Sequence, residues 1–384
     1  ISSVTSLDVY ARGILDLTGI EDFGALTNLS CGSNQLTNLD VSNNTVLTFL
    51  GCYSNQLTSL DLSNNPALTV LGCFGNPLTS LDVSNNTALE YLDCRSNQLT
   101  SLDVSNNTAL ISLNCNNNQL TSLDVSNNTA LTDLDCRVNQ LTSIDVSNNI
   151  ALEDLRVRNN QLIGLDVSNN IELTNLSTGN NQLTNLDVSN NPELIFLFCY
   201  NNSLTSLDVS NNTVLNSLWC YNNQLTSLDV SNKPELISLI CDSNQLTSLD
   251  VRNGNNSIIE EFDTTNNPNL TCIYVDDADY SNANWTNIDP NSTFVENEAE
   301  CEVLSIGDNA LELDVFIYPN PTDDYLFIEG NKNPVSISIY NLLGTEVISK
   351  RNTDKIKVSE LSKGVYIIRI SDGVGQTNRK FIKN

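Results

Sequence analysis

Histidine and methionine are absent from this 384-residue chain, and basic residues are scarce. Only 17 lysines and arginines stand against 46 aspartates and glutamates, which gives a formal charge of −29. Without histidine, Ser-His-Asp and Cys-His catalytic arrangements and histidine-based zinc sites are excluded. The charge argues against binding to nucleic acid or an anionic membrane, because both need clustered lysine and arginine. The sequence has no run of about 18 apolar residues, so we expect no transmembrane helix.

The charge divides the chain into three parts. Residues 1–250 carry 25 acidic and 6 basic side chains, and residues 251–310 carry 12 and one. Residues 311–384 carry 9 acidic and 10 basic side chains, so this last part is close to neutral. We expect three regions of different architecture.

A repeat of 21 residues fills the first part. One unit, residues 110–130, reads LISLNCNNNQLTSLDVSNNTA. Eleven units begin at Leu26, Leu47, Leu68, Leu89, Leu110, Leu131, Leu152, Leu173, Leu194, Leu215 and Leu236. A fixed period of this length is the signature of a solenoid, in which stacked units share one continuous core.

The pattern LxxLxCxxNxL, followed by a second LxxLxVxxN, resembles the leucine-rich repeat family in its short bacterial variety. The resemblance covers residues 4–252 and implies a repeat solenoid of mostly β character, with parallel strands and little helix. We expect an N-terminal entry unit at 1–25 and the eleven repeats at 26–252. Each repeat would form one strand from its first half and an opposite strand from its second half. Two columns of asparagine, at Asn118 and Asn128 in the unit above, would satisfy backbone groups where the coil turns.

Nine of the eleven cysteines fall on the period. They form a column of parallel side chains at rung spacing, so we interpret them as small buried hydrophobic residues rather than metal ligands. Cys272 and Cys301 lie off the period, and we expect a disulfide that closes a C-terminal cap at 253–302. Two free thiols are the alternative. A disulfide would place the protein in an oxidising compartment.

The last part, after a linker at 303–314, reads as short alternating strands separated by turn residues. We expect strands at 316–318, 325–329, 335–340, 346–349, 355–358, 365–370 and 376–382, and hence a small all-β sandwich domain at 315–384. The segments PNP at 319–321, IYNLLG at 339–344, LSKGVY at 361–366 and RKFIK at 379–383 occur in this order.

Together these segments resemble the type A C-terminal sorting domain of the type IX secretion system. The resemblance implies that residues 315–384 engage the secretion machinery and that the protein is secreted or lies on the outer cell surface of a Gram-negative bacterium. It also implies an N-terminal signal peptide. A generic immunoglobulin-like accessory module is the alternative.

Side chains at the exposed positions of the first strand vary from repeat to repeat and form three groups. The N-terminal aromatic group is Phe49, Tyr53, Phe74 and Tyr91. The central charged group is Arg95, Arg137, Arg156 and Arg158 among Asp93, Asp133, Asp135 and Asp154. The C-terminal aromatic group is Phe196, Phe198, Tyr200, Trp219 and Tyr221. Exposed aromatic and arginine side chains are typical of binding hot spots, so we predict a ligand-binding face. The alternative is that they only fill the sheet surface and balance charge.

Aspartate occupies one exposed position of the second half in all eleven repeats, from Asp40 to Asp250. A calcium ladder, for example at Asp103, Asp124 and Asp145, or binding to a periodic ice or mineral lattice would use such a column. We favour a solvated acidic face, because the spacing of a calcium-binding loop is missing. We therefore expect no cofactor and no metal, with weak calcium binding as the alternative.

These observations predict an exported recognition protein that binds a protein, peptide or surface glycan through the variable face of its solenoid. The alternative is a structural or adhesive protein that uses the repeated Asp/Ser face. We expect no enzymatic activity, since carboxylates on a regular open ladder lack an enclosed pocket.

Overall fold

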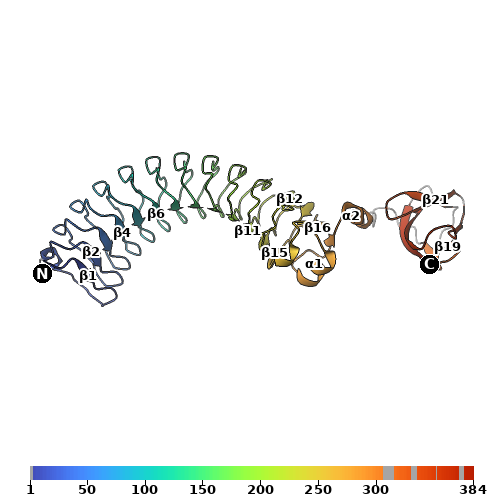
Figure 1. Ribbon diagram of the computed structural model, residues 1–384, viewed down its shortest axis with the longest axis horizontal. Helices are drawn as coiled ribbons and strands as arrows, with labels where there is room; N and C mark the ends of the chain where they lie inside the picture. The colour runs from blue at the N-terminus through green and yellow to red at the C-terminus, as the bar shows by residue number, and fades with distance from the viewer. Residues whose placement is uncertain (1–2, 306–314, 330–334, 352, 372–375) are drawn as a thin grey trace. The chain divides into compact units, whose positions relative to one another are not determined.

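The computed structural model describes residues 3–305, 315–329, 335–351, 353–371 and 376–384 (Figure 1). The chain forms two compact units, Ile1–Phe294 and Val295–Asn384.

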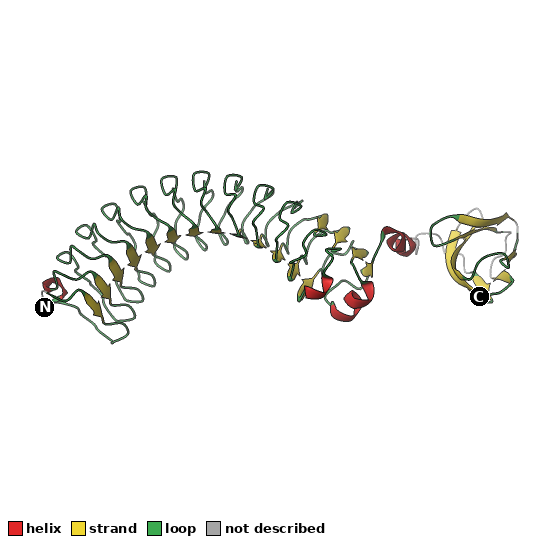
Figure 2. Cartoon of the chain, viewed as in Figure 1, coloured by secondary structure: helices red, strands yellow, loops and turns green. Residues whose placement is uncertain are grey.

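The first unit is a curved parallel β-solenoid, as the repeat predicts. One strand per turn lies on the inner, concave side of the arc (Figure 2). These strands form a 13-stranded parallel sheet, in the order β1 (Ser6–Asp8), β2 (Asn28–Ser30), β3 (Phe49–Gly51), β4 (Val70–Gly72), β5 (Tyr91–Asp93), β6 (Ser112–Asn114), β7 (Asp133–Asp135), β8 (Asp154–Arg156), β9 (Asn175–Ser177), β10 (Phe196–Phe198), β11 (Ser217–Trp219), β13 (Ser238–Ile240) and β15 (Glu261–Asp263). Equivalent residues of successive repeats pair in register, for example Leu113 with Leu134.

The core of the solenoid consists of leucine, valine and cysteine from every turn. In β6 the central Leu113 is buried while both flanking residues are partly exposed, as the alternation of a strand requires. All nine periodic cysteines are buried and free. Burial raises the pKa of Cys31, Cys73 and Cys199 to about 12, which makes these thiols unreactive.

The first asparagine column links each turn to the one before it. The side-chain amide of Asn118 donates to the carbonyl oxygens of Cys115, at 3.0 Å, and Cys94, at 3.1 Å. Its Oδ1 accepts a hydrogen bond from the amide of Leu99 at 3.0 Å. Because Cys94 and Leu99 belong to the preceding turn, each asparagine joins two turns at a point where the backbone cannot pair with itself.

The second half of each repeat forms turns on the convex side. Within residues 3–305, strands occur there only in the last turns, as the four-stranded sheet β12 (Ser227–Asp229), β14 (Ser248–Asp250), β16 (Cys272–Tyr274) and β17 (Thr293–Val295). The expectation of an opposite strand in every repeat was therefore wrong. The outer side of an arc is longer than its inner side, so the segments there are spread too widely for a regular ladder of backbone hydrogen bonds.

In the described residues of the solenoid, helical segments occur only near its two ends. A short 3-10 helix, η1 (Ile20–Asp22), lies in the entry unit, and η2 (Asn256–Ile258) and α1 (Ala278–Asn284) lie in the C-terminal cap. The sheet runs past residue 252, where the last repeat was expected to end, through one further turn that contains β15. Trp285 stacks on Phe262 with ring centroids 4.2 Å apart and covers the end of the core. Both off-period cysteines are disulfide-bonded, as predicted: Cys272 and Cys301.

In its described residues, the second unit contains helix α2 (Glu298–Ser305) and seven strands. Helix α2 includes the first three residues of the expected linker, and residues 306–314 lie outside the described part of the chain. The strands form two antiparallel sheets that share one hydrophobic core, in the orders β18 (Phe316–Tyr318), β19 (Tyr325–Glu329) and β22 (Lys355–Lys357), and β21 (Glu346–Arg351), β20 (Ser336–Tyr340), β23 (Gly364–Ser371) and β24 (Gln376–Lys383). The predicted small β-sandwich is confirmed.

Candidate functional site

The C-terminal aromatic group forms a continuous cluster on the concave sheet. Phe198 lies between Phe196 and Trp219, with ring centroids 6.2 and 4.8 Å away. Tyr221 stacks almost parallel on Tyr200 at 4.7 Å. Register explains the cluster, since Phe198 pairs with Trp219 on the adjacent strand. Phe196 is exposed and Phe198, Trp219 and Tyr221 are partly exposed, so most of the cluster faces solvent.

Tyr200 differs from its neighbours because it is buried, with 7% of its surface exposed. The expectation that it lies on the exposed face was wrong. Its ring lies over Gly179 of the preceding turn, where there is no side chain, and its hydroxyl accepts a hydrogen bond from Arg158 at 3.2 Å. Tyr200 therefore packs against one face of the Tyr221 ring and exposes little surface of its own.

The N-terminal aromatic group is only partly assembled. Tyr53 stacks on Phe74 at 4.6 Å, and the guanidinium of Arg95 lies 4.3 Å from the centre of the Phe74 ring. Tyr10, which the sequence analysis missed because it lies off the period, packs 5.9 Å from Tyr53. Among the described residues, Phe49 and Tyr91 make no ring contact with this stack.

Three of the four arginines of the central charged group form ion pairs with an aspartate two residues earlier, and Arg158 donates to the Tyr200 hydroxyl instead. Arg137 makes two hydrogen bonds to Asp135, at 2.8 and 2.7 Å, and Arg156 pairs with Asp154. Burial raises the pKa of Asp154, and the charge of Arg156 opposes this effect. Within the described residues, Arg158 has no carboxylate partner, so it is the arginine of this group whose charge is not paired.

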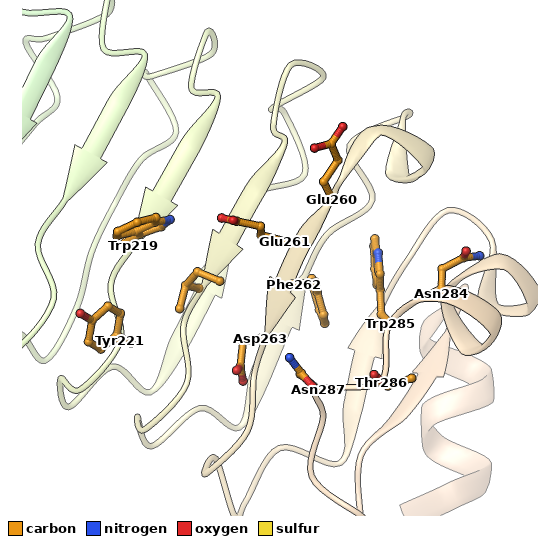
Figure 3. A pocket seen from close by; sticks show the side chains of 11 residues that line it. Trp219, Tyr221, Glu260, Glu261, Phe262, Asp263, Asn284, Trp285, Thr286 and Asn287 are labelled. Atoms are coloured by element: carbon orange, nitrogen blue, oxygen red, sulfur yellow. The ribbon is translucent and has the colours of Figure 1, made fainter.

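A series of side-chain hydrogen bonds connects the C-terminal aromatic group to a carboxylate. The indole Nε1 of Trp219 donates to the hydroxyl of Ser238 at 2.9 Å, and this hydroxyl donates to Oε2 of Glu261 at 2.7 Å. Figure 3 shows the Glu261 side chain directed toward Trp219. These hydrogen bonds fix the orientation of the indole ring and bring a negative charge close to it.

Beyond Trp219 the surface opens into a hollow of about 550 Å³. It is lined by Trp219, Tyr221, Ile240, Glu260, Glu261, Phe262, Asp263, Asn284, Trp285, Thr286 and Asn287 (Figure 3). Sequence reasoning found only the first two of these residues. A signal for the others existed, since Ile259, Phe262, Thr264 and Asn267 repeat the LxxLxCxxN spacing after an interval of 23 residues instead of 21.

The aspartate column of the convex side caps its own turns. Oδ1 of Asp103 accepts a hydrogen bond from the amide of Ser105 at 2.9 Å, and the same bond recurs at Asp124 and Asp145. This bond and the nearby serine hydroxyl lower the pKa of these carboxyl groups. Within the described ranges, no group of three or more acidic or cysteine side chains is arranged to hold a metal ion. The hydrogen bonds from the serine amides stabilise the turns in which the column lies.

Comparison with known proteins assigns the last part of the chain. Residues 316–384 match the family model of the secretion system C-terminal sorting domain. This match places the protein outside the cell or on the cell surface of a Gram-negative bacterium. No curated protein sequence matches the chain. In the described part of the chain, no helix has the length and apolar character needed to span a membrane.

Solved structures resemble the solenoid. The functional domain of InlJ from Listeria monocytogenes, described as including a cysteine ladder, is 27% identical with a TM-score of 0.61, covering 100% of this chain and 91% of that one. An internalin, InlF, from the same organism is 25% identical with a TM-score of 0.57, covering 69% of this chain and 87% of that one. A leucine-rich repeat protein of Leptospira interrogans is 21% identical with a TM-score of 0.61, covering 77% and 96%.

Leucine-rich repeat proteins are typically non-catalytic and bind other proteins. The parallel solenoid, the periodic cysteines and asparagines, and the matched C-terminal segment all agree with these comparisons. The chain is a leucine-rich repeat protein with a C-terminal sorting domain of the type IX secretion system.

Proposed function

We propose that this chain is an exported recognition protein that binds a partner protein on the concave face of its solenoid. One observation carries the proposal: Phe196, Phe198 and Trp219 form a contiguous aromatic surface that is open to solvent. Large aromatic side chains dominate the binding energy of protein interfaces, and an exposed cluster of them needs a reason.

The shape of the first unit supports this location. A solenoid presents an extended concave surface, and the side chains on it vary while the core residues repeat. The convex side offers the opposite, a row of aspartates that is the same in all eleven repeats. In Asp103, Asp124 and Asp145, Oδ1 already accepts a hydrogen bond from the residue's own turn.

The rest of the concave face would contribute secondary contacts. The stack of Tyr53, Phe74 and Arg95 offers a second, smaller aromatic surface near the N-terminus of the solenoid. Between the two surfaces lies the central charged group, whose four arginines and four aspartates balance in formal charge. A polar, internally balanced strip beside an aromatic centre is typical of the rim of an interface.

The sorting domain determines where the partner is found. Cargo carrying such a domain is delivered to the cell surface or released, so the partner is an extracellular or surface protein. We expect the sorting domain to serve export, and the solenoid to carry the recognition.

A protein microarray of extracellular and surface proteins, probed with the full chain, tests this function. For the best partner, the triple variant F198A/W219A/Y221A should bind at least about tenfold more weakly than the unchanged chain, because hot-spot truncations cost about 2 kcal/mol or more. The matched control I150A/I163A/I171A removes three exposed apolar side chains outside the concave strands and should retain affinity.

Two outcomes would overturn the proposal. The first is an unchanged dissociation constant for the aromatic variant while its melting curve shows a folded solenoid. The second is binding only to glycans on a parallel glycan array, with no protein bound.

A further inference from the structure

The hollow beside Trp219 collects negative charge without a basic residue of its own. Glu260, Glu261 and Asp263 line it, and none of its described lining residues is lysine or arginine. Asp242 lies one rung before, and its pKa is raised by burial and by the charge of Asp263. In the central charged group, by comparison, Asp93, Asp135 and Asp154 each pair with an arginine. The carboxylates of the hollow have no such partner among its lining residues.

The hollow also combines these carboxylates with aromatic walls. Trp219 and Tyr221 form one side, and the buried Trp285 and Phe262 form the other (Figure 3). A cation within about 6 Å of an aromatic face is attracted by the ring quadrupole, and this attraction strengthens where water is partly excluded.

This chain uses the same combination twice for its own arginines. The guanidinium of Arg95 lies 4.3 Å from the centre of the Phe74 ring, and its Nε lies 3.7 Å from a carboxylate oxygen of Asp93.

The second example is Arg252, whose guanidinium lies 4.9 Å from the centre of the Tyr274 ring and pairs with Asp250. In both places a planar guanidinium is held between an aromatic ring and a carboxylate. The hollow presents rings and carboxylates of the same kind, with the space between them open to solvent.

The charged hydrogen-bonding groups of the hollow are all acceptors, although Tyr221, Thr286 and Asn287 can also donate. The indole nitrogens of Trp219 and Trp285 donate to Ser238 and to the carbonyl oxygen of Ile259, at 2.9 and 3.4 Å. The side-chain amide of Asn284 donates to a carbonyl oxygen of its own helix at 2.8 Å.

By contrast, no described residue donates a hydrogen bond to the Glu260 carboxylate, and Glu261 accepts only the hydrogen bond from Ser238. A neutral sugar hydroxyl could use the donors of Tyr221, Thr286 and Asn287, but it would not balance the three carboxylate charges. Guanidinium and ammonium groups donate only and carry positive charge, so they match the carboxylates of Glu260, Glu261 and Asp263.

We propose that the hollow receives an arginine side chain of the partner protein. Arginine fits better than lysine, because its planar group stacks on an aromatic ring and meets two carboxylate oxygens at once. The inference rests on the proposed function, since it names the chemistry of one contact within the same concave surface.

The probe is the blocked peptide acetyl-Gly-Gly-Arg-Gly-Gly-amide, titrated into the full chain at about 0.15 M salt, where long-range attraction is screened. The control peptide carries citrulline, which keeps the shape and loses the charge. Tryptophan fluorescence reports occupancy, since Trp219 lines the hollow. We expect the arginine peptide to bind at least about tenfold more tightly than the citrulline peptide.

A matched pair of variants distinguishes the effect of the charges in the hollow from the effect of the net charge of the protein. E260Q/E261Q/D263N removes three negative charges from the hollow and keeps the size of the side chains, so the fold should persist. D103N/D124N/D145N removes three negative charges from the convex column. The first variant should lose at least about tenfold in affinity for the arginine peptide, and the second should stay within about twofold.

Equal losses in the two variants, or equal binding of the arginine and citrulline peptides, would overturn this inference. Either result would leave the proposed function standing, provided that F198A/W219A/Y221A still weakens binding of the protein partner. If that triple variant has no effect while the arginine peptide still binds in the hollow, the proposed function fails and the site remains.

Discussion

The ring of Tyr200 lies directly over Gly179, one turn earlier in the solenoid. A Cβ atom at Gly179 would come within 2.6 Å of two ring carbons, closer than any side chain tolerates. The same arrangement recurs at the other end, where a Cβ at Gly32 would come within 2.7 Å of the ring of Tyr53. In both aromatic groups a glycine thus admits a tyrosine ring, and a second aromatic ring stacks on that tyrosine.

Replacing Gly179 by alanine should displace the Tyr200 ring and break its hydrogen bond to Arg158. Overpacking of this kind costs about 1–3 kcal/mol in the free energy of unfolding, measured by urea denaturation. The control Gly164→Ala adds a Cβ with nothing within 4 Å and should change stability by less than about 0.5 kcal/mol. Equal effects of the two substitutions would contradict the packing described here.

Replacing Asn118 by alanine should destabilise the solenoid by about 1–3 kcal/mol, because it leaves the buried amide of Leu99 without its acceptor, while the carbonyl of Cys94 keeps the hydrogen bond from Asn97. Gln119 is the neighbouring control, since its side chain is exposed and Gln119→Ala should cost less than about 0.5 kcal/mol. Thermal melting followed by circular dichroism compares the two. A melting temperature unchanged in Asn118→Ala would show that the ladder is dispensable.

Acid should lower the stability of the solenoid by protonating the aspartate column. The pKa values of Asp103, Asp124 and Asp145 lie below the ordinary value of 3.8, because serine amides and hydroxyls stabilise the charged form. A lowered folded-state pKa contributes stability above the unfolded-state value, and this stability is lost as pH falls through the folded-state pKa. D103N/D124N/D145N cannot titrate there, so its melting temperature should fall less than that of the unchanged chain between about pH 5 and pH 2. Parallel curves for the two proteins would argue against this role.

The nine periodic thiols should be inert in the folded protein. Burial raises the pKa of Cys31, Cys73 and Cys199 to about 12, so almost no thiolate forms at pH 8. Ellman's reagent should therefore label no cysteine in the native chain and nine after denaturation without reductant. Reduction before denaturation should add the two cysteines of the disulfide, for eleven in all. Rapid labelling of the native chain would contradict the burial of the column.

Much of the fold could be predicted from the sequence because the repeat applies one local rule in every turn. Leu113 and Cys115 have to face inward because alternate residues of a strand share a face, and a single turn cannot bury them alone. The strands of the sorting domain were predictable for a similar reason. Turn residues separate short alternating runs, and every predicted strand is present with its ends within two residues of those expected.

The candidate site was less predictable because it depends on contacts between turns. Tyr200 occupies the same column as the partly exposed Tyr221, and only the absence of a side chain at Gly179 lets its ring sink into the surface. Glu261 was missed because two extra residues before it shift the period from 21 to 23. The prediction of a convex strand in every repeat was wrong because the spacing of the outer turns depends on the curvature of the arc. No single repeat encodes that curvature.

The sequence by itself determined the solenoid, its buried cysteine and asparagine columns and the sorting domain, because each follows from periodicity or from motifs close in the chain. Only the tertiary structure decided which exposed side chains meet. Stacking along the solenoid brings Trp219, Ser238 and Glu261 into one hydrogen-bonded chain from three different turns. Such contacts depend on the register of adjacent turns and on the volume that each neighbour leaves free, and both are properties of the folded molecule.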